Sequence, residues 1–419
     1  MTTVASPPAR SVAEAAALIA PYVERTPLLR SEAFSSLTGS EVFLKVEALQ
    51  TTGAFKLRGA LHKLLRMDPA VRARGVLTAS AGNHGQGLAH AARLLGIPAW
   101  VVLPLGVPLA KLTAIQRTGA EVTLSGSDYD EAHAEALRLA AEHAATYVHA
   151  FDDPDVIAGQ GTVALEMLDQ MPTLDTIVVP VGGGGLLAGC AQVTGPRRVR
   201  LVGAQAEGAP AFARSFEARS VVEVPAHTIA DGIAVRRPSE LTLRLALGSV
   251  DAVRTVPDEA IARAMVVLLE RHKLLSEAAG AAALAVVLES GVRLGDRVGI
   301  VISGGNVDPN LLGKVIQQGL ASAGRYLAFR TWLDDQPGRL HDLTGVLSAA
   351  HINILHIGIH RLGPHTSLGR VGLDVIVDTR DRAHASSVLR LVREQGFPAE
   401  ELLDVHPAPT LPLGGTDAL

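Results

Sequence analysis

The sequence predicts an α/β protein, made of repeated βα units around a parallel sheet, followed by a smaller α+β domain. From Glu41 to about Gln318, short runs of β-branched residues alternate with longer Ala- and Leu-rich stretches of helical period, and glycine or proline separates them. This alternation is typical of a parallel sheet. After about residue 326 the expected order changes to β-α-β-β-α-β, the split βαβ arrangement.

In the first part of the chain, most expected strands are followed directly by a helix, as βα units require. Asp128 and Pro257 stand where a helix cap and a helix start are expected. The strands are expected at residues 42–46, 76–79, 99–103, 121–124, 176–180, 199–205, 252–256 and 297–302. The clearest helices are expected at 83–95, 109–117, 129–142, 162–170, 258–271 and 278–289.

The C-terminal part has its own rhythm. Residues 319–325, GLASAGR, are small and polar, and we interpret them as a linker between a domain at 1–318 and a domain at 326–406. Residues 407–419 are expected to be a mobile tail. Within the second domain, strands are expected at 326–333, 354–362, 370–378 and 402–405, and helices from the turn at 335–338 to about 351 and at 383–394.

Composition excludes several classes of function. The 419 residues suggest about two or three domains. A balance of 38 Lys and Arg against 42 Asp and Glu gives a net charge of −4, so no basic excess is available for nucleic acid or an anionic membrane. Cys190 is the single cysteine, which excludes an intrachain disulfide and favours a reducing compartment. Without a signal-peptide pattern or a long apolar segment, we expect a cytoplasmic protein.

A run of four glycines suggests an anion site. It follows the strand TIVVP, precedes the helical run LLAGCAQV, and consists of Gly182, Gly183, Gly184 and Gly185. Such a loop exposes backbone N–H groups at the positive end of a helix, which suits a phosphate better than a mere tight turn. A dinucleotide is an alternative, because Gly183, Gly185 and Ala188 satisfy G-x-G-x-x-A, and Glu207 follows the next strand. An NAD-dependent oxidoreductase therefore stays open at this point.

Two further polar loops follow expected strands, SAGNHGQG at 80–87 and SGGN at 303–306. Loops at the carboxyl ends of strands in an open α/β sheet converge on one crevice. The first loop opens a helix, so its N–H groups could hold a substrate carboxylate, while Asn83 offers an amide to a ring substituent. Either loop alone could be an ordinary capped turn. Together with the glycine run, they predict a shared site.

Lys56 lies near an expected helix start in TTGAFKLRGA, after Gly53 and Phe55. A lysine there is normally a solvated cation, which the helix dipole disfavours. In a segment of small and apolar residues, burial and the positive helix end would lower the pKa of Lys56 and expose a nucleophilic amine. A buried amine and a phosphate loop together indicate an aldehyde cofactor that bears a phosphate. We interpret Arg58 as a structural ion-pair partner without a chemical role.

These segments carry a family resemblance. TTGAFKLRGA, SAGNHGQG, VGGGGL and SGGN, in this order and at these separations, resemble the fold type II pyridoxal-phosphate enzymes, specifically threonine ammonia-lyases and the related serine racemases. RTPL at 25–28 and TIADGIAV at 228–235 resemble the same family. The D-x-P-G-x-L turn at 335–340 is similar to that of an ACT domain. The resemblance implies two lobes around a cofactor cleft, the smaller at roughly 50–150, and an ACT-like regulatory domain.

The resemblance also implies a role for each matched residue. Lys56 would bind the aldehyde of pyridoxal 5'-phosphate and remove the substrate α-proton, while Phe55 would lie against the ring. Asn83 would bond the phenolic oxygen. Ser303 would face the pyridine nitrogen, with Glu277 near the ring. Backbone N–H groups of Gly182, Gly183, Gly184, Gly185 and Leu186 would hold the phosphate. Backbone and side-chain donors of Ser80, Asn83 and His84 would hold the substrate carboxylate.

The implied reaction is elimination of water from L-threonine to give 2-oxobutanoate and ammonia, with L-serine as a second substrate. The neutral Ser303 hydroxyl suits elimination, because it need not keep the ring nitrogen protonated. A serine or amino-acid racemase is the alternative, disfavoured because Ala81 stands where such racemases carry a second serine as base. The ACT resemblance implies a branched-chain amino-acid effector such as isoleucine near Gly338, Leu340 and Asn353, or a purely structural dimerisation module. It also implies a homotetramer or homodimer.

We expect no metal site, and the alternative is a cation held by Glu207 with backbone carbonyls and water. The cation site of racemase-like relatives would use Glu207, the backbone near Ala211 and an acid at a position where this chain has Ala213. His356 and His360 would face the same side of a strand, but zinc needs a third ligand, and the nearby sequence places no carboxylate or thiol there. These histidines are expected to face solvent.

Overall fold

The computed structural model describes residues 11–289, 294–322, 324–360 and 369–402. The chain divides into two compact units, Met1–Asp308 and Pro309–Leu419, and each is described by itself. None of the helices in the described ranges has the length and apolar character needed to span a membrane.

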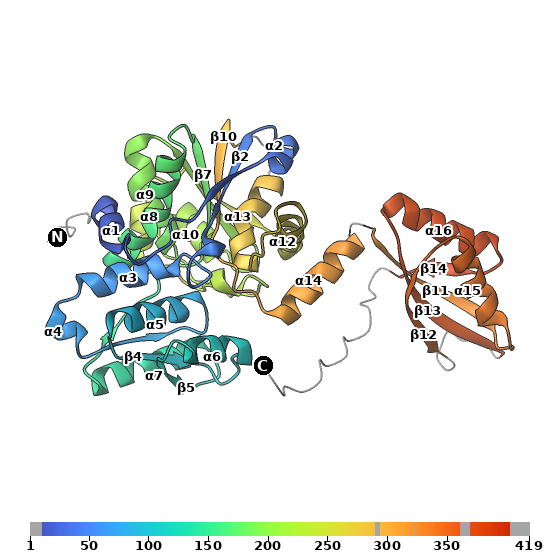
Figure 1. Ribbon diagram of the computed structural model, residues 1–419, viewed down its shortest axis with the longest axis horizontal. Coiled ribbons are helices and arrows are strands. Elements are labelled where there is room, and N and C mark those ends of the chain that lie inside the picture. Colours follow the sequence, from blue (N-terminus) through green and yellow to red (C-terminus); the bar gives the residue numbers. More distant parts are fainter. Residues whose placement is uncertain (1–10, 290–293, 323, 361–368, 403–419) are drawn as a thin grey trace. The chain divides into compact units, whose positions relative to one another are not determined.

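The larger sheet of the first unit has the strand order β1-β2-β10-β7-β8-β9. Its neighbours pair in parallel, except that β1 is antiparallel to β2. The central strands are buried along almost their whole length, because α8 and α9 cover one side of β7 and α13 the other (Figure 1). The strands are β1 (Leu28–Ser31), β2 (Glu41–Val46), β7 (Thr176–Pro180), β8 (Arg200–Ala206), β9 (Ala252–Val256) and β10 (Arg297–Ile302).

The smaller sheet of the first unit has the order β5-β4-β3-β6, and all its pairs are parallel. It forms the core of a second lobe, on which helices α5 and α7 pack. Its strands are β3 (Val76–Ala79), β4 (Ala99–Leu103), β5 (Glu121–Leu124) and β6 (Thr146–Tyr147), and the helices of this part of the chain are α3 (Lys56–Arg66), α4 (Pro69–Arg72), α5 (Asn83–Leu95), α6 (Leu109–Gln116) and α7 (Tyr129–Glu142).

The remaining helices of the first unit include one that the sequence pattern placed too late. A helix was expected at 162–170, whereas α8 begins at Pro154, where the side chain of Asp153 accepts the backbone N–H groups of Asp155 and Val156. Gly159 and Gly161 lower the helical propensity of its first half. The others are α1 (Val12–Ile19), α2 (Glu32–Thr38), η1 (Glu47–Leu49), α8 (Pro154–Gln170), α9 (Gly185–Arg197), α10 (Ala211–Ala218), η2 (Asp231–Ile233), α11 (Glu240–Leu247), α12 (Asp258–His272) and α13 (Ala278–Glu289).

The second unit has an antiparallel sheet of order β12-β13-β11-β14, with one face against α15 and α16. Along β11 every second side chain is buried, which is the pattern of a sheet covered on one face. Its elements are α14 (Pro309–Ser322), β11 (Tyr326–Asp334), α15 (Arg339–Ala349), β12 (Ile354–His360), β13 (Arg370–Asp378), α16 (Arg382–Glu394) and β14 (Ala399–Glu401).

Two expectations for the second unit differ from the structure. The segment expected as a linker, 319–325, continues α14 through Ser322, and Gly324 in the left-handed region (φ +69°) follows the helix. A strand is found at Ala399–Glu401, before the one expected at 402–405, and the apolar side chains of Phe397 and Ala399 enter the core. Residues 361–362 and 403–405 of expected strands, and the expected tail at 407–419, lie outside the described residues.

Candidate active site

A cavity of about 1070 Å³ lies in the first unit, lined by the residues that directly follow strands β3, β7 and β10. The structure brings together around it every residue that the family resemblance assigned to cofactor or substrate, whereas Gly338, Leu340 and Asn353 belong to the second unit. The residues around the cavity are Phe55, Lys56, Ser80, Asn83, His84, Gly182, Gly183, Gly184, Gly185, Leu186, Glu277 and Ser303.

Lys56 is the first residue of α3, and its backbone is tied to the loop after β10. The N–H of Phe55 donates to the carbonyl of Ser303 at 3.1 Å, and Ala54 forms an antiparallel bridge with Gly304. The amine Nζ of Lys56 donates to the carbonyl of Ala150 at 3.0 Å. Loss of solvent lowers the pKa of Lys56 to about 8, although the charge of Glu277 acts in the opposite direction. A measurable fraction of the amine is therefore neutral near pH 7.

The glycine run forms the turn into α9. Gly184 has φ +91° and caps the helix, and Gly185 is its first residue. A Cβ atom at Gly183 would lie 2.4 Å from the ring of Phe151, so a side chain there would displace that ring. The N–H of Ala188 donates to the carbonyl of Gly184 at 2.8 Å, and helix geometry leaves the preceding N–H groups without an intrahelical acceptor. These groups at the positive helix end suit an anion.

A chain of amides and a carboxyl group joins three loops of the site. Nδ2 of Asn83 donates to Oε1 of Glu277 at 2.6 Å, and Nδ2 of Asn306 donates to Oδ1 of Asn83 at 2.8 Å. Asn306 also donates to the carbonyl of Thr52 at 2.8 Å, which links the chain to the segment before Lys56. Burial and the nearby charge of Asp231 raise the pKa of Glu277 to about 7. Glu277 is thus close to half-protonated at neutral pH.

His84 is buried, and its ring is held in one tautomer. Its Nε2 lies 3.0 Å from the carbonyl of Val148, which can only accept, so Nε2 carries the proton. Nδ1 is then an acceptor, and it is buried without a hydrogen-bond partner. Desolvation, with the charge of Lys56, lowers the pKa of His84 to about 3, so the ring is neutral. A substrate carboxylate would need the backbone N–H of His84, because the free ring nitrogen cannot donate.

Sequence reasoning missed several residues of the cavity wall. The carbonyl of Ala150 orients Lys56, and Phe151 packs against the glycine run, yet nothing in their local sequence marks either residue. Lys111 of α6 forms an ion pair with Asp231 of η2, and both line the cavity. Asp231 lies within TIADGIAV, so that motif could have pointed to it. Within the described ranges, no group of three or more His, Cys, Asp or Glu side chains is placed to hold a metal ion.

The residues present fit an aldehyde cofactor that carries a phosphate. Lys56 supplies a desolvated amine with a lowered pKa, and the start of α9 supplies free backbone N–H groups. The cavity of about 1070 Å³ is large enough for a cofactor and an amino acid together.

Comparisons with known proteins agree with this chemistry. A family model described as pyridoxal-phosphate dependent enzyme matches residues 19–304, and an ACT domain model matches residues 329–396. An L-threonine ammonia-lyase of Thermotoga maritima is 40% identical over 92% of this chain and 97% of that protein. A protein of the same name from Geobacter sulfurreducens is 42% identical over 90% of this chain and 94% of its own length.

Two solved structures show the same fold in the first unit. A threonine deaminase from T.th. has a TM-score of 0.68 and 40% identity, covering 71% of this chain and 97% of that one. Maize serine racemase has a TM-score of 0.70 and 35% identity, and the match covers 75% of this chain and 99% of the racemase chain. The glycine run alone fitted either pyridoxal phosphate or a dinucleotide, and the family match decides for pyridoxal phosphate. The chain therefore belongs to the pyridoxal-phosphate dependent enzymes, in the family of the L-threonine ammonia-lyases, and its C-terminal part is an ACT domain.

Proposed function

We propose that this enzyme eliminates water from L-threonine to give 2-oxobutanoate and ammonia, and that it converts L-serine to pyruvate as a second activity. The observation that carries the proposal is the placement of Lys56, a desolvated amine, in one cavity with the glycine run at the start of α9. Relatives named L-threonine ammonia-lyase, at 40% and 42% identity, support the choice of substrate.

The protein side of the reaction centres on Lys56. Pyridoxal phosphate, when bound, supplies the electron sink that acidifies the α-proton of an amino acid. Nζ of Lys56 is the group that takes this proton, because its lowered pKa of about 8 leaves it partly neutral and its bond to Ala150 fixes its direction. Backbone N–H groups at the start of α5, including that of His84, would hold the carboxylate at a positive helix end.

Two side chains, Asn83 and Ser303, would set the electronic character of the ring. Nδ2 of Asn83 has two N–H groups, and since one donates to Glu277, the other is free for the phenolic oxygen of the cofactor. The Ser303 hydroxyl would face the ring nitrogen without a charge that keeps it protonated, which favours elimination over a long-lived carbanion. Gly182 to Gly185 and Leu186 would bind the phosphate through their backbone.

A racemase is the second candidate, because maize serine racemase shares the fold at 35% identity. Inversion at the α-carbon needs a proton donor on the ring face opposite Lys56. Ala81 lines the cavity and offers no such group. Incubation of L-serine in deuterated water distinguishes the two reactions, since racemisation would yield deuterated D-serine and elimination yields pyruvate.

The proposal is tested on the purified enzyme. We expect a visible absorption band of the lysine-bound cofactor, and borohydride reduction should fix the cofactor on Lys56, as peptide mapping would show. Incubation with L-threonine should release 2-oxobutanoate, and the Lys56→Ala variant should release none. A protein that carries the cofactor on Lys56 yet forms no 2-oxobutanoate would contradict the substrate while leaving the cofactor site intact.

We further propose that a branched-chain amino acid regulates the enzyme through its ACT domain, near Gly338, Leu340 and Asn353. Gly338 precedes α15 with φ +94°, and Leu340 is 38% exposed. Titration of isoleucine and valine against activity should change the rate of the intact enzyme, and the Leu340→Glu variant should respond less. If neither amino acid changes the rate of the intact enzyme, the ACT domain is a purely structural module.

We also propose that the enzyme is cytoplasmic and forms a homotetramer or a homodimer. Sedimentation of the pure protein would test the number of subunits.

A further inference from the structure

One buried ion pair joins the two ends of residues 47–58, the segment that carries Lys56. Glu47 begins η1, directly after β2, and Arg58 lies in the first turn of α3. Their side chains form a two-pronged pair, with Nε to Oε2 at 2.8 Å and Nη2 to Oε1 at 2.8 Å. Both side chains are 0% exposed. A bidentate pair of this kind fixes orientation as well as distance.

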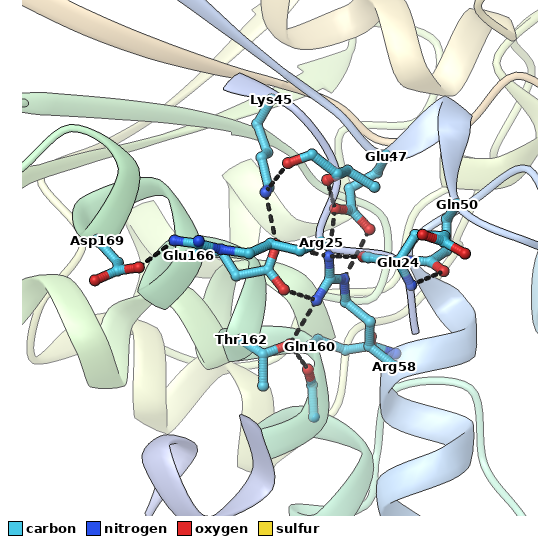
Figure 2. A network of polar contacts seen from close by, with 12 residues as sticks. Glu24, Arg25, Lys45, Glu47, Gln50, Arg58, Gln160, Thr162, Glu166 and Asp169 are labelled. Atoms are coloured by element: carbon cyan, nitrogen blue, oxygen red, sulfur yellow. Dashed lines mark hydrogen bonds and ion pairs between the residues drawn. The ribbon is translucent and has the colours of Figure 1, made fainter. Parts of the chain in front are cut away.

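The same guanidinium is attached to helix α8. Nη1 of Arg58 donates to Oε1 of Glu166 at 2.6 Å, and Nη2 donates to Oε2 at 2.9 Å, so a second carboxylate is held by two bonds (Figure 2). Glu166 also accepts Nζ of Lys45 at 2.6 Å. Further bonds reach Thr162 at 3.3 Å and the carbonyl of Glu24 at 3.2 Å. Every nitrogen of the Arg58 guanidinium therefore has an acceptor.

Helix α8 also packs against α9, the helix that follows the glycine run. A Cβ atom at Gly189 of α9 would lie 2.5 Å from the N of Gly161, which shows how closely the backbones of α8 and α9 cross. On the α3 side, a Cβ atom at Gly59 would lie 2.7 Å from the carbonyl of Val156. Both α3, which begins at Lys56, and α9, which follows the glycine run, are thus fixed to one rigid helix.

Stability alone is a poor explanation for this network. Buried ion pairs often contribute little net stability, because removing the charges from water offsets their attraction. Burial lowers the pKa of Lys45, and the attraction of Glu166 and Glu47 only partly opposes it. What apolar side chains could not supply is a guanidinium fork that holds two carboxylates from different elements at fixed angles.

We propose that Arg58 is a positioning residue for Lys56: it joins both ends of the 47–58 segment and anchors α3 to α8, so that the amine stays at a fixed distance and direction from the glycine run. The inference depends on the pyridoxal-phosphate site but not on the identity of the substrate. Misplacement of a reacting group by about 1 Å can lower a rate by roughly a hundredfold.

The test compares Arg58→Lys with the matched control Lys45→Met. Both variants remove nitrogen contacts to Glu166, but only Arg58 forms hydrogen bonds with Glu47 at the start of the segment that carries Lys56. For Arg58→Lys holoenzyme we expect kcat to fall about tenfold or more with KM within about threefold. We also expect its visible absorption band to titrate at a different pH and backbone amides of residues 47–58 to exchange faster.

For Lys45→Met we expect a lower melting temperature, with the spectral titration and the amide exchange of residues 47–58 as in the parent enzyme. If Arg58→Lys does not fold, Glu47→Gln, which removes the charge without removing atoms, gives the same comparison. The proposal is overturned if the Arg58 and Glu47 variants lose melting temperature yet keep the parent spectral titration, amide exchange and kcat. The spectral and exchange measurements use no substrate, so they remain decisive even if L-threonine is not the substrate.

Discussion

The lowered pKa of Lys56 leads to a prediction about how fast the apoenzyme captures its cofactor. Only the neutral amine attacks an aldehyde, so the rate depends on its fraction. With the pKa at about 8, roughly 9% of the amine is neutral at pH 7, against about 0.03% for an ordinary lysine. The protein environment therefore raises the reactive fraction roughly 300-fold at this pH. The cause is desolvation at the start of α3.

The assay is rapid mixing of apoenzyme with pyridoxal phosphate, followed by its visible absorbance between pH 6 and 10. Nα-acetyl-lysine is measured in parallel, because the cofactor has ionisations of its own that must be divided out. We expect the ratio of the enzyme's capture rate to that of Nα-acetyl-lysine to stay nearly constant below about pH 8 and to fall above it, because Lys56 is then already neutral while the free lysine is still losing its proton. A ratio that stays constant up to pH 10 would refute the reasoning, because it would mean that Lys56 titrates like a solvated lysine.

The Glu277→Gln variant tests the second contribution to this pKa. The negative charge of Glu277 raises the pKa of Lys56, so its removal should move the capture profile to lower pH. Because the pKa of Glu277 is itself about 7, its carboxyl is mostly neutral in more acidic solution. The two profiles should therefore differ between about pH 7 and 9, and converge below that range and again above it, where Lys56 is neutral in both proteins. A shift of the variant profile to higher pH would contradict this electrostatic coupling.

Two further predictions concern stability. The folded pKa of His84, about 3, lies below its usual 6.5, so the unfolded chain binds the extra proton between these values and stability falls with falling pH. Between pH 6.5 and 5, denaturant unfolding of the apoenzyme should show the free energy of unfolding of the parent falling by about 1.6 kcal/mol more than that of His84→Asn. Equal falls in the two proteins would contradict the prediction. Gly189→Ala should lower the free energy of unfolding by about 1–3 kcal/mol, because its Cβ would lie 2.4 Å from the carbonyl of Ile157. Gly248→Ala, where nothing lies within 4 Å, is the control and should change it by less than about 0.5 kcal/mol; a similar loss in both would disprove the close-contact explanation.

The loops of the site were predictable because each is a local pattern with its own chemistry. Four glycines after a buried strand, or a lysine between a phenylalanine and a helix, can be recognised without knowing what lies beside them. The rule that strand ends converge then places the loops together. Lys56, Asn83, the glycine run and Ser303 were found in this way.

The contacts that orient these groups were not predictable, since they join residues far apart in the chain. The acceptor for Nζ of Lys56 is a backbone carbonyl, at Ala150, and every residue type has one. The acceptors of Arg58 come from Glu47 and Glu166, in different elements, and only the folded chain shows that both reach it. The sequence likewise suggested that the ring of His84 donates to the substrate carboxylate, whereas its Nε2–H donates to the backbone carbonyl of Val148.

Glycine shows why one residue type can both reveal and hide structure. At Gly184 it permits a left-handed turn into a helix that offers its N–H groups to an anion, and the pattern reveals a site. Gly159 and Gly161 lie inside α8, where glycine lowers the helix propensity, so the sequence pattern predicted a helix start later than Pro154. The absence of a side chain there allows the backbones of neighbouring helices to approach closely. The glycines that weaken the helical signal of α8 are thus the ones that let it hold the lysine and the anion loop in a fixed relation.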